Sequence, residues 1–232
     1  TLDKDNNVYV ASENPVSVFK ITPAGVITQI MDASTDGVNS INNITALTVD
    51  SNNNVFVGGA GSNNVFKITP GGTITQIIDA TGDGTIILGY LSSLAVDNNN
   101  NLYVGAESGA DIFKITPAGV ISVFYNNSIG VSNLAVDNLN NIYATTSFGD
   151  YVYKITQAGV ATQIIDATGD GTSSLSGPSA IAIDDSFNVY VSGEYSYNAF
   201  KITPSGVITE IISNNSNTPY FSNAYDITLD DS

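Results

Sequence analysis

Short apolar runs separated by polar turns recur along the whole chain. Residues 45–79 show the pattern most clearly, reading TALTVD, SNNN, VFVGG, AGSNN, VFKIT, PGG and TITQIID. Runs rich in Val, Ile, Thr and Phe that are bounded by Gly, Asn, Asp or Pro are typical of β-strands joined by tight turns. This stretch therefore predicts four antiparallel strands, which we name a to d in chain order.

The unit is repeated five times. Its most constant part reads VFKITP, VFKITP, IFKITP, VYKITQ and AFKITP, with lysines at positions 20, 67, 114, 154 and 201. The spacings of 47, 47, 40 and 47 residues between these lysines belong to repeat architectures. One four-stranded sheet cannot bury both of its faces, whereas sheets packed face to face can. We therefore predict an all-β protein, a β-propeller of five four-stranded blades.

We predict a single domain over residues 1–232, with blades at residues 1–32 plus 224–230, 44–79, 92–124, 132–166 and 179–212. The first blade begins with only a stub of strand a, Thr1-Leu2-Asp3, which matches Thr228-Leu229-Asp230 near the C-terminus. We therefore expect the C-terminal strand to pair with the N-terminal blade and close the ring. Six blades, with one missing from this chain, is the alternative. The start in mid-repeat leads us to expect a processed piece of a larger chain or assembly.

The turns have a regular chemistry. The a to b turns read DKDNN, DSNNN, DNNNN, DNLNN and DDSFN. Asp and Asn side chains hydrogen-bond the local backbone and tolerate left-handed dihedrals, which suits tight turns. The c to d turns, TPAG and its copies, predict a type I turn with glycine at the fourth position.

Composition narrows the range of functions. The chain has 6 Lys+Arg against 22 Asp+Glu, a net charge of -16, and no cysteine or histidine. Nucleic acid is disfavoured as a partner because phosphate binding needs clustered cations. The missing Cys and His remove disulfides, thiol nucleophiles, the usual zinc ligands and the commonest general base. No apolar run approaches the ~18 residues of a membrane span, so we expect no membrane insertion.

The chain resembles the NHL-repeat family in its bacterial form. The resemblance is carried by LAVD followed by NN and YV, then FKITPAGVIT, then a GDG loop leading into PSAIAID, and it is closest over residues 153–191. It implies a β-propeller used as a binding platform, although a fold alone does not fix a function. Some family members bind RNA through a basic face, and lyase relatives use histidine-bound metal. This chain lacks both features.

Candidate binding residues fall on the rim formed by the b to c and d to a loops. Three glutamates occupy equivalent places there, and several aromatic residues around the fourth and fifth blades depart from the repeat. The expected binding residues are Glu13, Glu107, Glu194, Tyr195, Tyr197 and Tyr220, with Phe148, Tyr151, Phe221 and Tyr225 as further off-pattern aromatics.

The d to a loops DASTDG, DATGDG and DATGDG resemble the opening of a calcium-binding loop, because oxygen-bearing side chains occupy the first, third and fifth positions before a glycine. Ordinary Asp-Gly turns are the alternative, since no Glu stands at the twelfth position. No cofactor is required, and calcium is the one considered. Its candidate ligands are Asp32, Asp36, Asp79, Asp83, Asp166 and Asp170.

The repeated lysine lies on the same face of strand c as the apolar residue two positions before it. We expect its aliphatic stem to lie against the neighbouring blade and its ammonium to pair with an aspartate between blades, because an unpaired buried charge is costly. A lysine ring that binds an anion is the alternative. The aromatic residue of strand b, such as Tyr9, is expected to pack between blades.

Together these features predict a non-enzymatic binding module of a secreted or cell-surface protein, which recognises a protein or glycan through its acidic loop rim. The alternatives are a calcium-dependent lactonase-like hydrolase and a structural repeat segment of an adhesin or filament. Asn43, Asn126 and Asn214 begin N-x-[ST] triplets, which are weak signals of glycosylation in a chain so rich in these residues.

Overall fold

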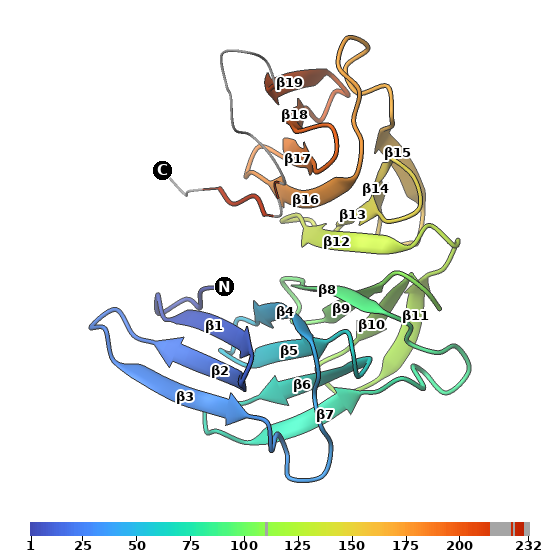
Figure 1. Cartoon of the computed structure of the whole chain (residues 1–232). Helices are drawn as coiled ribbons and strands as arrows, with labels where there is room; N and C mark the ends of the chain where they lie inside the picture. Colours follow the sequence, from blue (N-terminus) through green and yellow to red (C-terminus); the bar gives the residue numbers. More distant parts are fainter. Residues whose placement is uncertain (110, 214–223, 225, 230–232) are drawn as a thin grey trace. The chain divides into compact units, whose positions relative to one another are not determined.

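The computed structural model of this chain describes residues 1–109, 111–213, 224 and 226–229. Every regular element in this part of the chain is a β-strand. It contains no helix of the length and apolar character needed to cross a membrane. The chain divides into two compact units, residues 1–128 and 129–232 (Figure 1).

The first unit holds three antiparallel sheets. Sheet 1 is formed by β1 (Val8–Glu13), β2 (Val16–Ile21) and β3 (Ile27–Asp32). Sheet 2 is formed by β4 (Ile44–Val49), β5 (Val55–Gly59), β6 (Asn64–Ile68) and β7 (Ile74–Ile78). Sheet 3 is formed by β8 (Leu91–Val96), β9 (Leu102–Ala106), β10 (Ile112–Ile115) and β11 (Ile121–Tyr125).

The second unit holds two further sheets. Sheet 4 is formed by β12 (Val131–Val136), β13 (Ile142–Thr146), β14 (Val152–Ile155) and β15 (Ala161–Ile165). Sheet 5 is formed by β16 (Pro178–Ile183), β17 (Val189–Gly193), β18 (Asn198–Ile202) and β19 (Ile208–Ile212). Strands adjacent in the chain are adjacent in each sheet, so the predicted antiparallel meander is confirmed, with four strands in sheets 2 to 5.

Sheet 1 has three strands and a short N-terminal addition. Leu2 forms an antiparallel bridge with Val8, and the N–H of Tyr9 donates to the carbonyl of Thr1 at 2.9 Å. Val10 is 45 % exposed, whereas Val57 at the equivalent place in sheet 2 is fully buried. The described residues include no closed sheet, and Tyr225 and Asp230 lie outside them. Closure by residues 224–230 therefore stays a prediction.

Apolar side chains fill the space between neighbouring sheets within each unit. Val18 of sheet 1 packs with Val57 and Phe66 of sheet 2, and all three are fully buried. In the second unit Val152 of sheet 4 packs in the same way with Phe200 of sheet 5. Full burial of such a side chain stabilises the fold by roughly 1.5–3 kcal/mol. The alternation of apolar and polar positions along each strand thus produces stacked sheets with a core between each pair.

The c to d turns have the predicted form. The N–H of Gly25 donates to the carbonyl of Thr22 at 2.8 Å, and Gly25 has a φ of 80°. A positive φ strains residues that carry a Cβ, so glycine is favoured at this position. The equivalent glycines with positive φ are Gly72, Gly119, Gly159 and Gly206.

Candidate functional site

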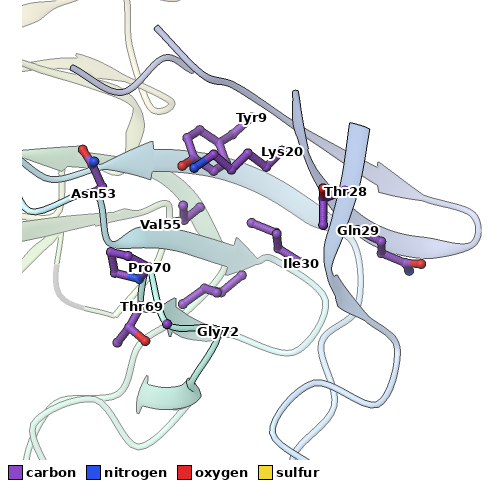
Figure 2. Close-up of a pocket in the computed structure, with 12 residues that line it drawn as sticks. Tyr9, Lys20, Thr28, Gln29, Ile30, Asn53, Val55, Thr69, Pro70 and Gly72 are labelled. Carbon is purple, nitrogen blue, oxygen red and sulfur yellow. The ribbon is translucent and has the colours of Figure 1, made fainter. Parts of the chain in front are cut away.

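Two similar cavities open between neighbouring sheets, one in each unit. The cavity between sheets 1 and 2 has a volume of about 430 Å³ and is lined on one side by Tyr9, Lys20 and Thr28 (Figure 2). The cavity between sheets 4 and 5 has a volume of about 500 Å³ and is lined by Tyr143 and Lys154. Both volumes fall in the range of ligand-binding pockets. A third, of about 130 Å³, lies between sheets 2 and 3.

The strand register builds the polar wall of each cavity. In sheet 1, Tyr9 pairs with Lys20, and Lys20 pairs with Thr28, so the three residues form a row across the sheet. The opposite wall of this cavity comes from sheet 2, with Val55 and Ile68 both 2 % exposed. The repeat therefore produces an amphipathic pocket where the apolar core between the sheets ends.

Each a to b turn is organised by its first aspartate. Oδ1 of Asp3 accepts from the N–H groups of Asp5 and Asn7 at 2.9 Å each. Oδ2 of Asp3 accepts from the Asn7 amide at 2.8 Å and from the Tyr9 hydroxyl at 2.9 Å. The same network recurs at Asp97, Asp137 and Asp184.

These contacts shift the titration of both partners. Burial raises the pKa of Asp3, but the hydrogen bonds from Asn7 and Tyr9 outweigh it, so the net pKa is lowered. Burial and the hydrogen bond to Asp3 raise the pKa of Tyr9 to about 12. Both groups thus keep their charge state across the physiological range, with the carboxylate ionised and the phenol neutral.

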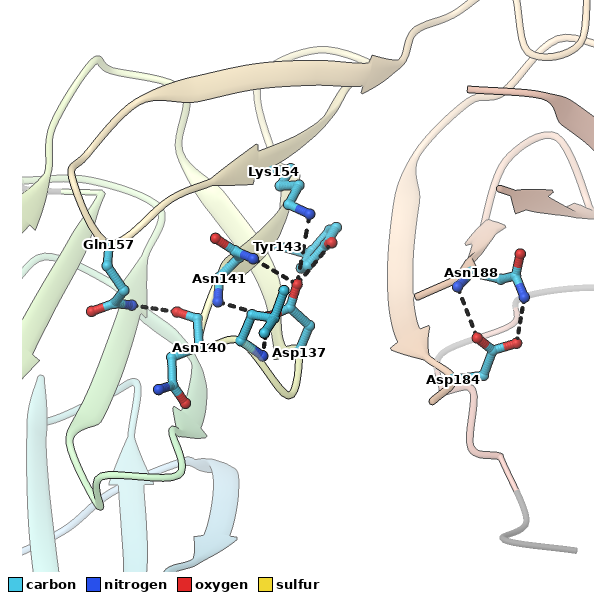
Figure 3. A network of polar contacts seen from close by, with 9 residues as sticks. Asp137, Asn140, Asn141, Tyr143, Lys154, Gln157, Asp184 and Asn188 are labelled. Carbon is cyan, nitrogen blue, oxygen red and sulfur yellow. Dashed lines mark hydrogen bonds and ion pairs between the residues drawn. The ribbon is translucent and has the colours of Figure 1, made fainter. Parts of the chain in front are cut away.

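Each repeat lysine lies over the aromatic ring of strand b. Lys154 Nζ lies 5.2 Å from the centroid of the Tyr143 ring and 3.7 Å from Oδ2 of Asp137 (Figure 3). Asp137 and Lys154 belong to the same sheet, so the expected pairing between blades is wrong for this pair. The corresponding contacts elsewhere are Lys20 with Tyr9, Lys67 with Phe56, Lys114 with Tyr103 and Lys201 with Tyr190.

The predicted rim glutamates lie at the other ends of the strands. Glu13 is the last residue of β1 and is exposed. Glu107 and Glu194 follow β9 and β17, are half-buried, and donate their backbone N–H groups to the carbonyls of Tyr90 and Gly177 at 2.8 Å. The structure places these glutamates on three different sheets, and their role in binding stays a prediction.

The off-pattern aromatics gather in the loops of the second unit. Phe148 is 64 %, Tyr151 38 % and Tyr195 67 % exposed. The loop of sheet 4 is tied to the segment before β16, because Oδ1 of Asp150 accepts from the N–H of Gly177 at 2.8 Å. Tyr197 is half-buried with a φ of 53°, and Tyr220 lies outside the described residues.

The Tyr195 ring covers the same glycine. A Cβ placed on Gly177 would lie 2.6 Å from this ring, so the tyrosine packs directly on the glycine backbone. Tyr195 and Asp150 thus both contact Gly177, each from a different loop. The geometry presents exposed aromatic surface beside carboxylates on a loop framework that its own hydrogen bonds hold in place.

The aspartates proposed as calcium ligands hydrogen-bond within their own loops. Oδ1 of Asp79 accepts from the Thr81 N–H at 2.8 Å, and Oδ1 of Asp83 accepts from the N–H groups of Thr85 and Ile86. The equivalent contacts form at Asp32, Asp36, Asp166 and Asp170. No group of three His, Cys, Asp or Glu side chains gathers among the described residues. Calcium binding stays a prediction, and the lactonase-like alternative gains no metal site from this part of the chain.

Comparison with solved structures shows what this chain is similar to. It matches virginiamycin B lyase from Staphylococcus aureus with a TM-score of 0.75 and 20 % identity, over 94 % of this chain and 70 % of that one. It matches a catalytically inactive histidine-to-alanine variant of this lyase with quinupristin at a TM-score of 0.77, with the same identity and coverage. It matches a chain of the nidogen/laminin complex with a TM-score of 0.70 and 14 % identity, over 97 % of this chain and 80 % of that one.

No protein-family model and no curated protein matches the chain. The structural matches, together with the repeated four-stranded sheets, support a β-propeller with about five blades. They do not identify the repeats as NHL repeats. The resemblance stated from the sequence is therefore confirmed at the level of the fold.

The prediction that this chain is not an enzyme is overturned by these matches. The similar structures include virginiamycin B lyase and a streptogramin B lyase, which are enzymes. Identities of 16 to 20 % transfer the fold and no particular reaction. The inactive variant lacks one histidine of that lyase, and the present chain contains no histidine.

Sequence reasoning missed the cavities and the contact between Asp150 and Gly177. The row of aromatic residue, lysine and hydroxyl residue could have been found, because it recurs in register at each repeat, with Phe56 in place of tyrosine in sheet 2 and Ser122 in place of threonine in sheet 3. The side chains that distinguish one cavity from another are single departures within Asn-rich turns. Their partners lie in a different repeat, so no local pattern shows them.

Proposed function

We propose that this chain is a protein-binding β-propeller module that acts outside the cell or at the cell surface, and that the loop rim of its second unit binds a partner with a basic surface. One observation carries the proposal. Exposed aromatic side chains from neighbouring loops, Phe148, Tyr151 and Tyr195, share these loops with the acidic residues Asp150 and Glu194, and Asp150 and Tyr195 both contact Gly177. We call these five residues the aromatic rim.

Exposed aromatic side chains on an ordered loop framework are typical of interaction sites. Aromatic residues are enriched in interfaces because they bury a large area with few rotatable bonds. The aromatic rim departs from the repeat. Phe148 and Tyr195 occupy the same place in their repeats, and the second and third repeats have Gly61 and Ser108 at this place. Repetition therefore does not explain these side chains, whereas binding does.

The charge of the chain favours a basic partner. The net charge of -16 raises the rate of encounter with a cationic surface and repels an anionic one. Within the aromatic rim, Asp150 and Glu194 are the charged residues, and both are acidic. We therefore expect the association rate to fall as salt is added, because charges more than about 10 Å apart are screened at about 0.1 M salt.

One comparison supports the proposal, and one hydrogen bond bears on how the C-terminal residues are held. The matched chain from the nidogen/laminin complex is a precedent for this fold in a protein assembly. Within the second unit, the carbonyl of Ala224 accepts from the Ser179 hydroxyl at 2.5 Å, as the carbonyl of Leu91 accepts from Thr45 in the first unit. Ala224 is therefore joined to β16 by a hydrogen bond equivalent to the one that joins Leu91 to β4.

Binding measurements with single substitutions test the proposal. The immobilised chain is screened against a panel of secreted and surface proteins, and the dissociation constant of each hit is measured for Phe148→Ala and Tyr195→Ala. Each variant should weaken a true partner by roughly tenfold or more. Leu139→Ala is the matched control, because Leu139 is 66 % exposed but lies in the a to b turn of sheet 4. Hits that bind all three variants equally, or a panel without hits, would contradict the proposal.

A further inference from the structure

We propose that the cavity between sheets 1 and 2 binds a neutral sugar residue, a hexose unit of a glycan. This site is independent of the aromatic rim, because it lies in the first unit and at the turn end of the strands. The proposal rests on three features of the cavity. One is an unsatisfied acceptor, one is a row of donors, and one is an apolar wall.

The unsatisfied acceptor is Oδ1 of Asn53, which lines the cavity. Its amide nitrogen donates to the carboxylate of Asp5 at 2.8 Å, which fixes the amide orientation. Oδ1 is buried and is the one buried side-chain polar atom without a hydrogen-bond partner in the described part of the chain. Such an atom costs about 1–3 kcal/mol, a cost that a bound donor removes. Because Oδ1 is closed to solvent in this conformation, the proposal requires the Asn53 side chain to turn when a ligand hydroxyl binds.

The equivalent positions in the other cavities lack this feature. Oδ1 of Asn100, in the cavity between sheets 2 and 3, accepts from the N–H and the hydroxyl of Ser51 at 3.0 and 2.8 Å. Phe187 takes the place of asparagine in the cavity between sheets 4 and 5. The need for a donor is therefore specific to the first cavity and is not a general property of the repeat.

The opposite wall supplies donors. The Lys20 ammonium lies 5.8 Å from the centroid of the Tyr9 ring, half-buried, and no ion pair holds it among the residues described. Thr28 lies beside it in the strand register and can donate or accept. A ligand at this site must therefore combine acceptors for the ammonium with a donor for Asn53. Hydroxyl groups do both.

The remaining wall is apolar. Val55 and Ile68 line it as buried side chains. Pro70 lines it on the same side as Val55 (Figure 2). A pyranose has the complementary form, with hydroxyl groups around its rim and C–H groups on its faces. A volume of about 430 Å³ accommodates a sugar ring with displaced water.

The charges around the cavity favour a neutral sugar. The Lys20 ammonium is the cation on the wall, and the carboxylates of Asp3 and Asp5 lie in the turn beside it, bonded to Tyr9 and Asn53. An anionic sugar would meet these carboxylates and the net charge of -16. Attraction to one ammonium does not offset this repulsion, because like charges at short range are destabilising.

Amide chemical shifts during sugar titration test the site. Glucose, galactose, mannose and glucuronate are added separately to the labelled full chain. We expect a neutral hexose to shift the amides of Thr28, Asn53 and Gly72 with a dissociation constant of roughly millimolar, as the small size of the ligand allows. Absence of any saturable shift at about 100 mM, a hundredfold above this constant, overturns the proposal. Tighter binding of glucuronate than of every neutral hexose also overturns it.

Two variants separate binding from folding. Asn53→Gly removes the acceptor and tolerates the backbone, because Asn53 has a φ of 60°. Lys20→Met removes the ammonium and keeps the apolar stem. Each should weaken the hexose at least about fivefold. Asn140→Gly makes the same change at a φ of 63° in sheet 4 and should leave the affinity unchanged. Equal effects of all three variants would show that the site does not lie in this cavity.

A gain of binding is also expected. In the second unit Leu139 and Phe187 occupy the places of Asp5 and Asn53. The double variant Leu139→Asp with Phe187→Asn rebuilds the missing pair, so a second hexose site should appear with shifts at Thr162 and Gly206, which line this cavity. Tyr195→Ala should affect neither site. Loss of hexose binding in Tyr195→Ala would assign the sugar to the aromatic rim and overturn the proposal made here.

Discussion

The ammonium of Lys154 lies 3.7 Å from the carboxylate of Asp137, whose side chain is completely buried. It also lies 5.2 Å from the centroid of the Tyr143 ring. The three groups belong to one sheet, so the contact fastens the a to b turn to strand c of the same repeat. Lys154→Met keeps the stem and removes the charge. It should lower the free energy of unfolding by roughly 1 kcal/mol.

The matched control for this prediction is Lys201→Met. Lys201 lies 5.5 Å from the centroid of the Tyr190 ring, and no ion pair to Asp184 forms within the described residues. Denaturant unfolding of both variants, at low salt and at about 1 M salt, measures the difference. At low salt Lys154→Met should lower the free energy of unfolding more than Lys201→Met does. At high salt the difference between the two variants should become smaller. Equal losses under both conditions would show that the ion pair contributes nothing.

Tyr9 predicts a loss of stability at alkaline pH. Its folded pKa of about 12 lies above the unfolded value of 10.0, so the contribution of its hydroxyl is complete below pH 10 and is lost as the pH rises to 12. Tyr9→Phe should make the decline in the free energy of unfolding over this window shallower. Tyr195→Phe, at an exposed tyrosine, is the control. An unchanged decline in the Tyr9 variant would contradict the assigned hydrogen bond to Asp3.

Phe56 offers the opposite experiment. Four repeats place a tyrosine at this register, whereas sheet 2 has Phe56, and Asp50 therefore lacks the hydroxyl partner that Asp3 has. Asp50 and Phe56 both line the cavity of about 130 Å³, which leaves room for one oxygen. Phe56→Tyr should raise the free energy of unfolding by roughly 0.5–1.5 kcal/mol, measured by denaturant titration. A lower stability would mean that the added hydroxyl does not reach Asp50.

The repeat made the fold readable from the sequence. Each copy of VFKIT fixes the phase of the apolar residue and the lysine, and the Asp, Asn, Pro and Gly of the turns mark where strands end. Five copies of the same signal supported one another. The first sheet departs from this account, because its fourth strand would have to come from elsewhere in the chain, and strand pairing between distant segments leaves no local pattern.

The cavity between sheets 1 and 2 differs from the other cavities through side chains that are not shared by all repeats. Asn53 and Asn100 occupy the same place in the repeat, yet Ser51 satisfies the carbonyl of Asn100, and Asp5 turns the amide of Asn53 the other way. In each case the partner is a single side chain in the a to b turn of the preceding repeat. A repeat pattern predicts the features that all copies share and not the contacts that differ between them. The unsatisfied Asn53 in the cavity between sheets 1 and 2 therefore could not be predicted from the sequence.

Asp36 predicts a loss of stability in acid. The N–H and side chain of Asn39 lower the pKa of Asp36 from 3.8 to about 2. The carboxylate therefore stabilises the fold above pH 3.8, and this contribution is lost as the pH falls to 2. Asp36→Asn should make the fall in stability across this window smaller. Glu13→Gln, at an exposed acid at the end of β1, is the control. Equal acid sensitivity of the Asp36 variant and the unaltered chain would contradict the prediction.

The two glycines of the DATGDG loop at residues 166–171 are needed for different reasons. Gly169 allows close packing, and Gly171 allows a backbone conformation that other residues rarely adopt. A Cβ on Gly169 would lie 1.8 Å from the carbonyl oxygen of Ser173 and 2.9 Å from the Phe200 ring. Gly171 has a φ of 87°, and a Cβ there would meet nothing within 4 Å. Gly171→Ala should therefore cost about 1 kcal/mol, from the left-handed backbone alone. Gly169→Ala should cost roughly 2–4 kcal/mol, because the loop must also move away from the core.

Thermal unfolding of the two alanine variants measures this difference. Gly82→Ala provides a second test in the first unit, since its Cβ would lie 1.9 Å from the carbonyl oxygen of Ile86 and 2.9 Å from the Phe113 ring. It should lower the midpoint about as much as Gly169→Ala does. If Gly171→Ala lowered the midpoint equally, backbone conformation alone would explain both glycines, and the packing of these loops on Phe113 and Phe200 would carry no stability.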